Sequence, residues 1–228
     1  MKPGLHIVLE GPDASGKKTQ STLLVEHLNA TGIAAERISF PQYESPYGKL
    51  ITQYLEGRSP SIDPVYASIL YASDRALIAP KIREKLSQGT WIICDRYVES
   101  SLAHQVAHLE ETDILTDDTL SNWIIETEYE VLGIPRANHS ILLNVPFELC
   151  VRKAAERKVA EGRAGVVDIH EDDKRHLEKA WQLYQKMAAQ NAWPVVNCAP
   201  EGELLPREQI AAQIFDLVQE FNKKVADN

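Results

Sequence analysis

Short apolar runs alternate along the chain with longer stretches in which apolar residues recur at helical spacing. The apolar runs predict strands at "LHIVLE" (5–10), "AAERISF" (34–40), "WIICD" (91–95), "SILLNV" (140–145) and "WPVVNC" (193–198). Three of these runs are almost entirely apolar, which is typical of strands buried on both faces of a sheet. The remaining stretches predict helices at 17–30, 47–57, 64–88, 97–109, 117–132, 146–160, 171–190 and 206–224. Strands joined by helical crossovers of this length predict an α/β fold with a parallel sheet covered on both sides.

The length and the pattern predict a single domain over residues 1–228. We find no internal repeat, no low-complexity segment and no stretch with the composition of an interdomain linker. The most polar stretch, 154–175, carries two glycines and many charges between two helices. We therefore expect a lid at about 154–172.

Charge and cysteine content restrict the classes of partner. The formal net charge is -9, so the surface repels nucleic-acid backbones, and phosphate binding needs a local basic site. No apolar stretch reaches the length of a membrane span, and the N-terminus lacks a signal-peptide pattern. The three cysteines are odd in number, far apart and flanked by apolar residues. These features predict a cytoplasmic protein with reduced cysteines and with neither nucleic-acid nor membrane partners.

The segment "GPDASGKKTQ" follows the first predicted strand and leads into a predicted helix. Its glycines allow backbone N–H groups to face phosphate oxygens, and a lysine in this position reaches the terminal phosphates. The alternative is an ordinary corner between a strand and a helix. The phosphate-loop interpretation predicts nucleotide binding by Gly11, Pro12, Asp13, Ala14, Ser15, Gly16, Lys17, Lys18, Thr19 and Gln20.

Lys18 departs from the usual form of this loop. The motif requires Ser or Thr directly after the first lysine, because that hydroxyl coordinates Mg²⁺. An ammonium group cannot coordinate a cation. Either Lys18 points aside while other oxygens hold the metal through water, or the loop binds nucleotide without catalysis.

The loop resembles that of the thymidylate kinase family, because it contains an acidic residue, Asp13, and ends in "GKKTQ". Further segments resemble motifs of that family in the same order: "FPQY" (40–43), "LYASDRA" (70–76), "DRYVESSLAHQ" (95–105), "VLGIPRANHSILLNV" (131–145) and "VVDIHEDD" (166–173). The resemblance implies a three-layer P-loop NTPase fold with a five-stranded parallel sheet of order 2-3-1-4-5 and a lid. It also implies an ATP- and Mg²⁺-dependent kinase that converts dTMP to dTDP, and a homodimer.

Phosphoryl transfer depends on positioning and on neutralising charge, so cations and carboxylates are expected at the site. Asp95 and Arg96 follow a buried strand, at the sheet edge where α/β proteins bind ligands. The resemblance implies a catalytic set of Lys17, Asp95, Arg96, Arg157 and Arg163, the last two from the lid. It implies metal ligation by Asp13, Asp95 and Glu171.

Tyr71 and Arg75 are four residues apart on a predicted helix and share one face. A ring and a guanidinium side by side suit a nucleobase, although such a pair is more often a packed aromatic beside a surface charge. Pro80 should kink or break this helix. The resemblance implies an acceptor site formed by Asp13, Phe40, Pro41, Tyr43, Leu55, Tyr71, Arg75, Arg96, Ser101, His104, Gln105 and His170.

Four residues are unusual for the family: Gln42, Ser101, His104 and His170. Because histidine can donate a hydrogen bond to a sugar hydroxyl, His104 could relax selectivity for the deoxy sugar. Three alternatives therefore remain open beside dTMP phosphorylation. These are a kinase for another deoxynucleoside monophosphate such as dUMP, a kinase for several of them, and a catalytically impaired nucleotide-binding regulator.

Overall fold

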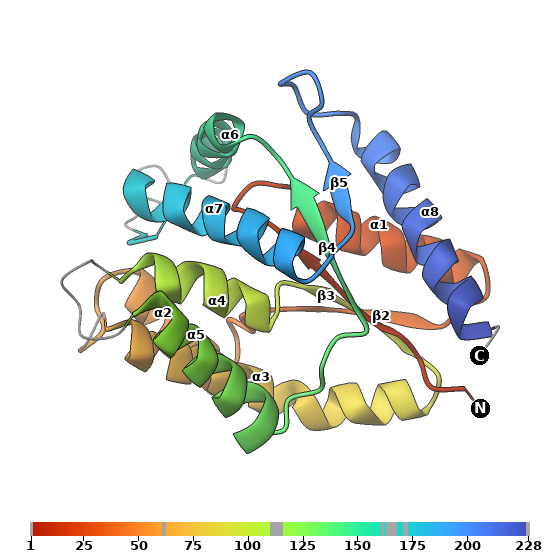
Figure 1. Ribbon diagram of the computed structural model, residues 1–228, viewed down its shortest axis with the longest axis horizontal. Helices are drawn as coiled ribbons and strands as arrows, with labels where there is room; N and C mark the ends of the chain where they lie inside the picture. Colours follow the sequence, from red (N-terminus) through yellow and green to blue (C-terminus); the bar gives the residue numbers. More distant parts are fainter. Residues whose placement is uncertain are drawn as a thin grey trace.

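A five-stranded parallel sheet forms the centre of the molecule (Figure 1). The computed structural model describes residues 2–60, 63–109, 116–160, 162, 168–170 and 173–226. The strands are β1 (His6–Glu10), β2 (Ala35–Ser39), β3 (Trp91–Asp95), β4 (His139–Asn144) and β5 (Val195–Asn197). Their order, β2-β3-β1-β4-β5, confirms the predicted topology. Each predicted strand lies within a few residues of its observed bounds.

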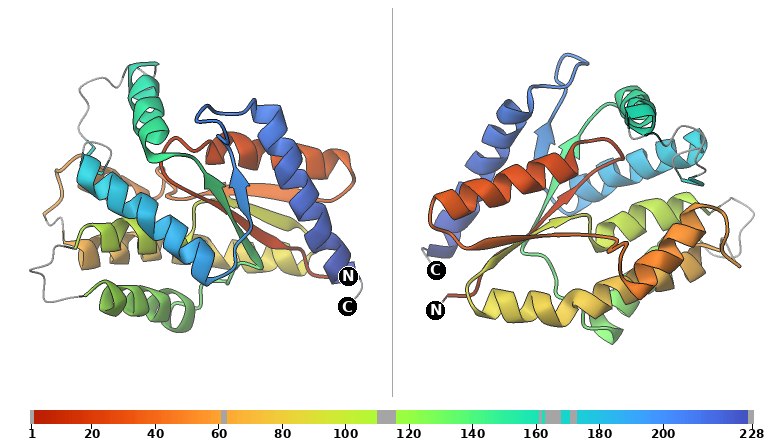
Figure 2. Two further views of the ribbon diagram at one scale, coloured as in Figure 1. Left: turned by 45° about the horizontal axis from the view of Figure 1, so that its top comes forward. Right: turned by 180° about the vertical axis from the view of Figure 1, so that it is seen from behind.

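Helices cover both faces of this sheet, which gives the three predicted layers (Figures 1 and 2). The helices are α1 (Lys17–Ala30), α2 (Pro46–Leu55), α3 (Pro64–Ser87), α4 (Val98–Ala107), α5 (Asp117–Ile125), α6 (Phe147–Ala160), α7 (Lys174–Gln190) and α8 (Arg207–Ala226). One core cluster joins α1 and α8 to the sheet face that includes Ile7 and Leu9. A second cluster joins α3, α4 and α5 to the opposite face, which includes Val8 and Ile92. Alternating strand residues thus supply both cores.

The stretch predicted as one helix over 117–132 has two parts. After α5, a π-helical segment continues as η1 (Glu126–Val131). Inserted π turns change the direction in which side chains project and are frequent at functional sites. In this segment Glu128 is buried, and its carboxylate pairs with an arginine of α3.

Pro80 lies inside α3 and does not end it. The helix continues to Ser87, so of the two expected outcomes, a kink or a break, the break does not occur. Ala79 and Ile82 flank the proline and are buried against β-strand residues of the second core cluster. This packing holds the helix together across the missing backbone hydrogen bond.

Part of the predicted lid falls outside the described residues. Arg163 and Glu171 are among the positions that the structure does not describe. The described part of the chain contains no helix long and apolar enough to cross a membrane.

Candidate active site

The parallel pairing of β1 and β3 brings two chain segments to one edge of the sheet. Leu9 of β1 lies opposite Asp95 of β3, so the loop after Glu10 and the turn after Asp95 begin side by side. Both strands are fully buried, which fixes these turns on a rigid support. The carboxyl edge of an open α/β sheet is the usual ligand site.

The loop after β1 has the geometry of an anion site. Gly11 has a φ of +146°, and a Cβ there would lie 2.8 Å from the Leu143 carbonyl oxygen. Gly16 has a φ of +92° and starts α1 without a side-chain cap. The first N–H groups of α1 therefore remain available, and the helix dipole adds partial positive charge. The first residues of α1 are two lysines, so a bound anion would also relieve repulsion with the dipole.

Lys17 folds back onto its own loop. Its Nζ donates to the carbonyl oxygens of Gly11 at 2.8 Å and Pro12 at 2.7 Å. Burial, together with the nearby Arg96 charge, lowers the pKa of Lys17 to about 8. The ammonium is thus held at the centre of the loop, where phosphate oxygens would replace the two carbonyls.

The next three residues of α1 differ in what they face. Lys18 and Thr19 are exposed to solvent. Gln20 is buried, and its Nε2 donates to the Arg207 carbonyl oxygen at 3.0 Å, which ties its amide to the start of α8. Exposure of Lys18 agrees with the expectation that its ammonium points away from a metal. The amide of Gln20 contacts α8 instead of the loop.

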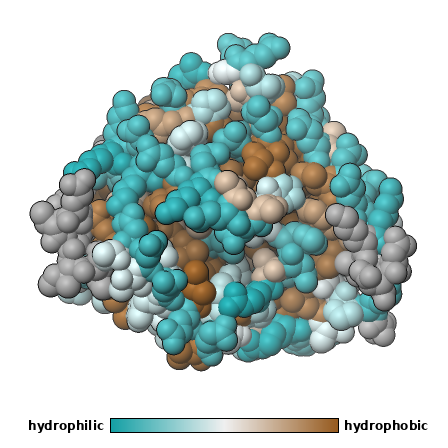
Figure 3. Space-filling view, in the orientation of Figure 1, coloured by the Kyte–Doolittle hydropathy of each residue, from teal (hydrophilic) through white to brown (hydrophobic). Residues whose placement is uncertain are grey.

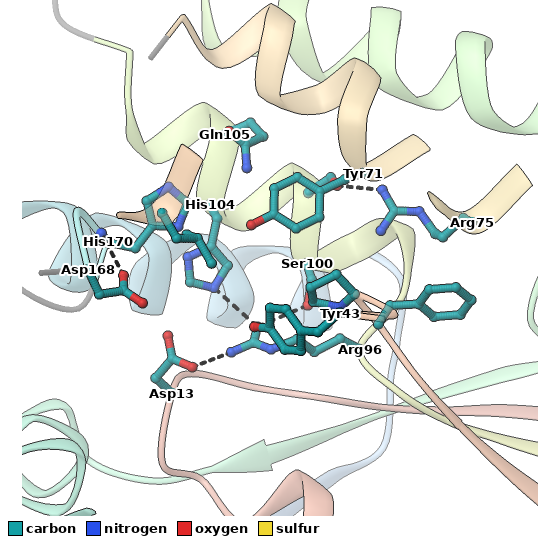
Figure 4. Close-up of a pocket in the computed structure, with 14 residues that line it drawn as sticks. Asp13, Tyr43, Tyr71, Arg75, Arg96, Ser100, His104, Gln105, Asp168 and His170 are labelled. Atoms are coloured by element: carbon teal, nitrogen blue, oxygen red, sulfur yellow. Dashed lines mark hydrogen bonds and ion pairs between the residues drawn. The ribbon is translucent and has the colours of Figure 1, made fainter. Parts of the chain in front are cut away.

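Arg96 connects the phosphate loop to the helices beside it. It has a φ of +68°, a conformation that non-glycine residues rarely adopt outside functional sites. Its Nη2 forms an ion pair with Asp13 (Figure 4). Its Nη1 donates to Ser100 Oγ at 3.1 Å and contacts His104 Nε2 and Tyr184 Oη, each at 3.2 Å. The guanidinium is therefore held by four partners from the loop, α4 and α7.

Asp13 carries a negative charge that its surroundings stabilise. Burial alone would raise the pKa of this carboxyl, but Arg96, His104, Lys17 and Arg157 together hold it well below its usual range. Arg157, near the end of α6, is one of the cations that lower the pKa of Asp13.

Asp95 has a partner that the sequence did not reveal. Its Oδ2 accepts from Arg37 Nη2 at 2.6 Å, and Arg37 Nε donates to Ser21 Oγ at 2.7 Å. The chain from β3 through β2 to α1 positions the carboxylate. Within the described residues, Oδ1 of Asp95 accepts no hydrogen bond, which leaves it available to a metal-bound water.

A pocket opens beside Arg96 and contains about 570 Å³ of space, part of it open to solvent. Figure 4 shows its side chains converging from several elements. It is lined by Asp13, Phe40, Pro41, Tyr43, Leu55, Tyr71, Arg75, Arg96, Ser100, Ser101, His104, Gln105, Asp168 and His170. All twelve residues expected at the acceptor site are in this set.

The base-binding pair predicted from helical spacing lies in this pocket, but Arg75 is also part of the core. Its Nε and Nη2 donate to the two oxygens of Glu128, each at 2.6 Å. Nη2 also donates to Ser101 Oγ at 2.6 Å, and Nη1 to the Tyr97 carbonyl oxygen at 3.1 Å. Of the five N–H groups of an arginine, one on Nη1 is left for a ligand.

Gln105 provides a further polar group on α4. Its Oε1 is buried and has no hydrogen-bond partner among the described residues. A buried acceptor without a partner is costly unless a ligand satisfies it. Gln105 also lines the pocket, which brings its amide group close to a ligand bound there.

The wall formed by residues 40–43 and 55 combines rigid and open parts. Phe40 is buried, whereas the ring of Tyr43 is 53% exposed at the pocket mouth. The Leu55 carbonyl oxygen accepts from Ile169 N at 2.9 Å, which fastens the end of the lid region to α2.

Glu10 is a site residue that sequence reasoning missed. Its Oε1 accepts from Tyr97 N at 2.7 Å and its Oε2 from Ser100 Oγ at 2.8 Å. Burial raises the pKa of this carboxyl, although Arg96, Ser100 and Lys17 oppose the shift. A charged residue at the end of an apolar strand, directly before Gly11, was a signal that could have identified it. Ser100, Glu128, Asp168 and Tyr184 were also missed.

Comparisons with known proteins agree with this geometry. The family model described as thymidylate kinase matches residues 9–209. A thymidylate kinase of Deinococcus radiodurans is 37% identical over 226 residues, covering 96% of this chain and 98% of the relative. The human thymidylate kinase is 43% identical over 100 residues, and this match spans about half of each chain, 44% and 47%.

A solved structure gives the same result for the fold. The thymidylate kinase of Candida albicans, for which broad substrate specificity was described, superposes with a TM-score of 0.74. It is 24% identical, and the match covers 97% of this chain and 93% of that one. At this identity the likeness concerns the fold alone.

Proposed function

Since the chain belongs to the thymidylate kinase family, we propose that it transfers the γ-phosphate of ATP to dTMP and releases dTDP and ADP. The observation that carries this proposal is the ion pair between Asp13 and Arg96. It joins the phosphate loop to the adjoining pocket, so a donor bound on the loop and an acceptor in the pocket would meet at one guanidinium.

The pocket offers groups that match a thymine ring. Thymine presents one N–H, at N3, between two carbonyl oxygens. The unpaired Gln105 Oε1 would accept the N3 proton, and the remaining N–H of Arg75 would donate to a carbonyl oxygen. Tyr71 supplies an aromatic surface in the same pocket.

Transfer needs positive charge around the migrating group. Lys17, Arg96 and Arg157 all act on the Asp13 carboxylate electrostatically, Arg157 from near the end of α6. We assign Arg96 to the acceptor phosphate and Lys17 to the terminal phosphates of ATP. Arg163, outside the described residues, remains part of the proposed lid set.

The donor set fits Mg²⁺. This ion keeps several waters and takes one or two carboxylates plus phosphate oxygens. Asp95 has one oxygen available near Lys17, and the charge of Asp95 partly offsets the lowering of the Lys17 pKa. Asp13 is ionised. These two carboxylates would hold the ion, with Glu171 as a further proposed ligand, and the ion would neutralise phosphate charge.

Comparison of acceptors tests the proposal. Release of ADP is measured with dTMP, dUMP, dCMP, dGMP, dAMP and the ribose analogue of dTMP, at fixed ATP and Mg²⁺. We expect the highest kcat/KM with dTMP. A higher value with dUMP or a purine nucleotide would refute the assignment of the base, and ATP binding without turnover on any acceptor would refute the assignment of an enzyme.

We also propose a cytoplasmic homodimer, with helices beside the sheet at its interface. A wide cleft between α5 and α7 includes the apolar side chains Leu102, Ile125, Leu183, Met187 and Trp193. Apolar residues are visible among polar ones on the face that Figure 3 shows. The cysteines are free and buried, as suits a reducing compartment. Sedimentation analysis of the wild type and of a Leu183→Glu variant tests the dimer.

A further inference from the structure

Four histidines from three segments meet beside the acceptor pocket. His104 lies on α4, and His108 directly follows the end of that helix. His170 lies just before α7, and His176 lies in the first turn of α7. The exposed fractions of His104, His170 and His176 are 7%, 5% and 2%. Each neutral imidazole ring has one N–H donor and one acceptor nitrogen, and both need a partner when the ring is buried.

The spacing of three of these rings suits a metal ion. One ligand nitrogen from each of His104, His170 and His176 lies within 4.8 Å of the other two. His104 Nδ1 and His176 Nε2 are 3.2 Å apart. In a tetrahedral zinc site with Zn–N bonds of about 2.0–2.1 Å, ligand nitrogens are about 3.3 Å apart.

The cluster also contains nitrogen atoms that the protein leaves without a partner. His176 Nδ1 and His108 Nε2 are buried and form no hydrogen bond to the described residues. The His108 ring centroid lies 4.4 Å from that of His176 and 4.8 Å from that of His170. A cation shared by His104, His170 and His176 would engage one nitrogen lone pair from each ring.

Charges of both signs surround the cluster. Asp168 Oδ1 accepts the His170 amide at 3.0 Å, and Asp173 Oδ1 accepts the His176 amide at 3.1 Å. The positive charge of Arg96 disfavours a bound cation, since Arg96 Nη1 contacts His104 Nε2. That contact can be released, because the two hydrogens of Nη1 would still have Ser100 Oγ and Tyr184 Oη as acceptors.

We propose that His104, His170 and His176 form a binding site for a divalent transition-metal ion, with Zn²⁺ as the best match to its imidazole donors. The site is distinct from the proposed Mg²⁺ site, whose ligands are oxygens. It would fasten the residues before α7 and the start of α7 to α4. His104 and His170 line the acceptor pocket, so a bound ion would fix both rings and raise the KM for dTMP.

Metal titration of the full chain tests this inference independently of kinase activity. After chelator treatment and dialysis, Zn²⁺ binding is measured by calorimetry in the presence of excess Mg²⁺, and Co²⁺ is used as a visible-absorption probe. We expect one ion per chain and the intense bands of tetrahedral Co²⁺. His176→Gln should weaken Zn²⁺ binding at least about 10-fold.

The control is His27→Gln on α1, whose ring stacks on Phe215 at 3.9 Å and takes no part in the cluster. It should bind Zn²⁺ like the wild type. His170→Gln provides a second test, and circular dichroism verifies that each variant is folded. Equal Zn²⁺ affinity in the wild type and a folded His176→Gln or His170→Gln variant would overturn the proposed site. An unchanged KM for dTMP in the Zn²⁺-loaded wild type would overturn its effect on the acceptor pocket.

Discussion

Arg75 and Glu128 form a two-bonded ion pair in the interior, with both N–O distances at 2.6 Å. The side chains of both residues are almost completely buried. The π-helical segment η1 brings Glu128 to this position. The pair fixes the guanidinium that we assign to the nucleobase.

Replacing Glu128 tests this positioning role. Glu128→Gln keeps the shape but removes the negative charge, so Arg75 becomes a buried cation without a compensating anion. We expect the free energy of unfolding to fall by about 3 kcal/mol and the KM for dTMP to rise at least about 10-fold. Denaturant unfolding and steady-state kinetics measure both effects.

Glu130→Gln is the matched control, because it removes an exposed pair with Arg136 in the same segment. It should change the free energy of unfolding by less than about 1 kcal/mol. If Glu128→Gln had effects as small as the control, Glu128 would not be what positions Arg75.

Arg96→Lys keeps the charge but loses the geometry. A lysine has a single ammonium and cannot contact Asp13 and the α4–α7 side simultaneously as the planar guanidinium does. We expect kcat to fall at least about 100-fold with ATP affinity nearly unchanged. Arg83→Lys is the control, because Arg83 is exposed on α3, and this substitution should leave kcat unchanged. A similar loss of kcat in Arg83→Lys would show that the effect of Arg96→Lys is not local to the site.

Lys18→Thr restores the residue that the common loop motif contains. Because Lys18 is exposed, we expect other oxygens to hold the metal and kcat to change by less than about 10-fold. A rise of several orders of magnitude would instead show that the native loop is impaired. The comparison should be repeated across Mg²⁺ concentrations, since a restored ligand would lower the Mg²⁺ requirement.

The affinity for ATP should depend on pH through Lys17. Its pKa is lowered to about 8 in the nucleotide-free protein, and phosphate oxygens would raise it again. Binding therefore takes up a proton above about pH 8, where the affinity should fall by up to about 10-fold per pH unit. Calorimetry in buffers of different ionisation enthalpy checks the proton uptake, and its absence at pH 9 would refute the linkage.

Glu99 should make the fold less stable at alkaline pH. Burial and the neighbouring Glu10 raise its pKa to about 7. Since the unfolded carboxyl ionises more readily, stability is fully present below about pH 4.5 and decreases as the pH rises through 7. Glu99→Gln should therefore be more stable than the wild type at pH 8, by on the order of 1–2 kcal/mol, but not at pH 4.5. Thermal unfolding of both proteins at the two pH values measures this difference in stability. A difference that is the same at pH 4.5 and pH 8 would refute the prediction.

The sequence was sufficient for the architecture because its signals are local. The bounds of α1 match the predicted helix, the five strands agree with the alternating pattern, and their order agrees with what the family resemblance implies. The π turn in η1 and the uninterrupted helix at Pro80 were not predictable in this way. Both are maintained by packing and ion pairing with residues distant in the chain.

The site shows the same division. The phosphate loop and the pocket residues were identified from motifs and resemblance, and the structure brings them together. The partners of the catalytic groups were missed, because Arg37 reaches Asp95 across β2 and β3, and Tyr184 reaches Arg96 from α7. No spacing along the sequence encodes such contacts. The histidine cluster was missed for the same reason: His104 and His170 were noted separately as acceptor-site residues, and His108 and His176 were not noted.

The most direct test of the proposed kinase activity follows the γ-phosphate of ATP to dTMP. The purified chain is incubated with γ-labelled ATP, Mg²⁺ and dTMP, and the products are separated. We expect the label to appear in dTDP, ADP to form in equal amount, and Arg96→Lys to reduce both equally. ATP bound at the loop with no label transferred to dTMP would refute the proposed kinase activity.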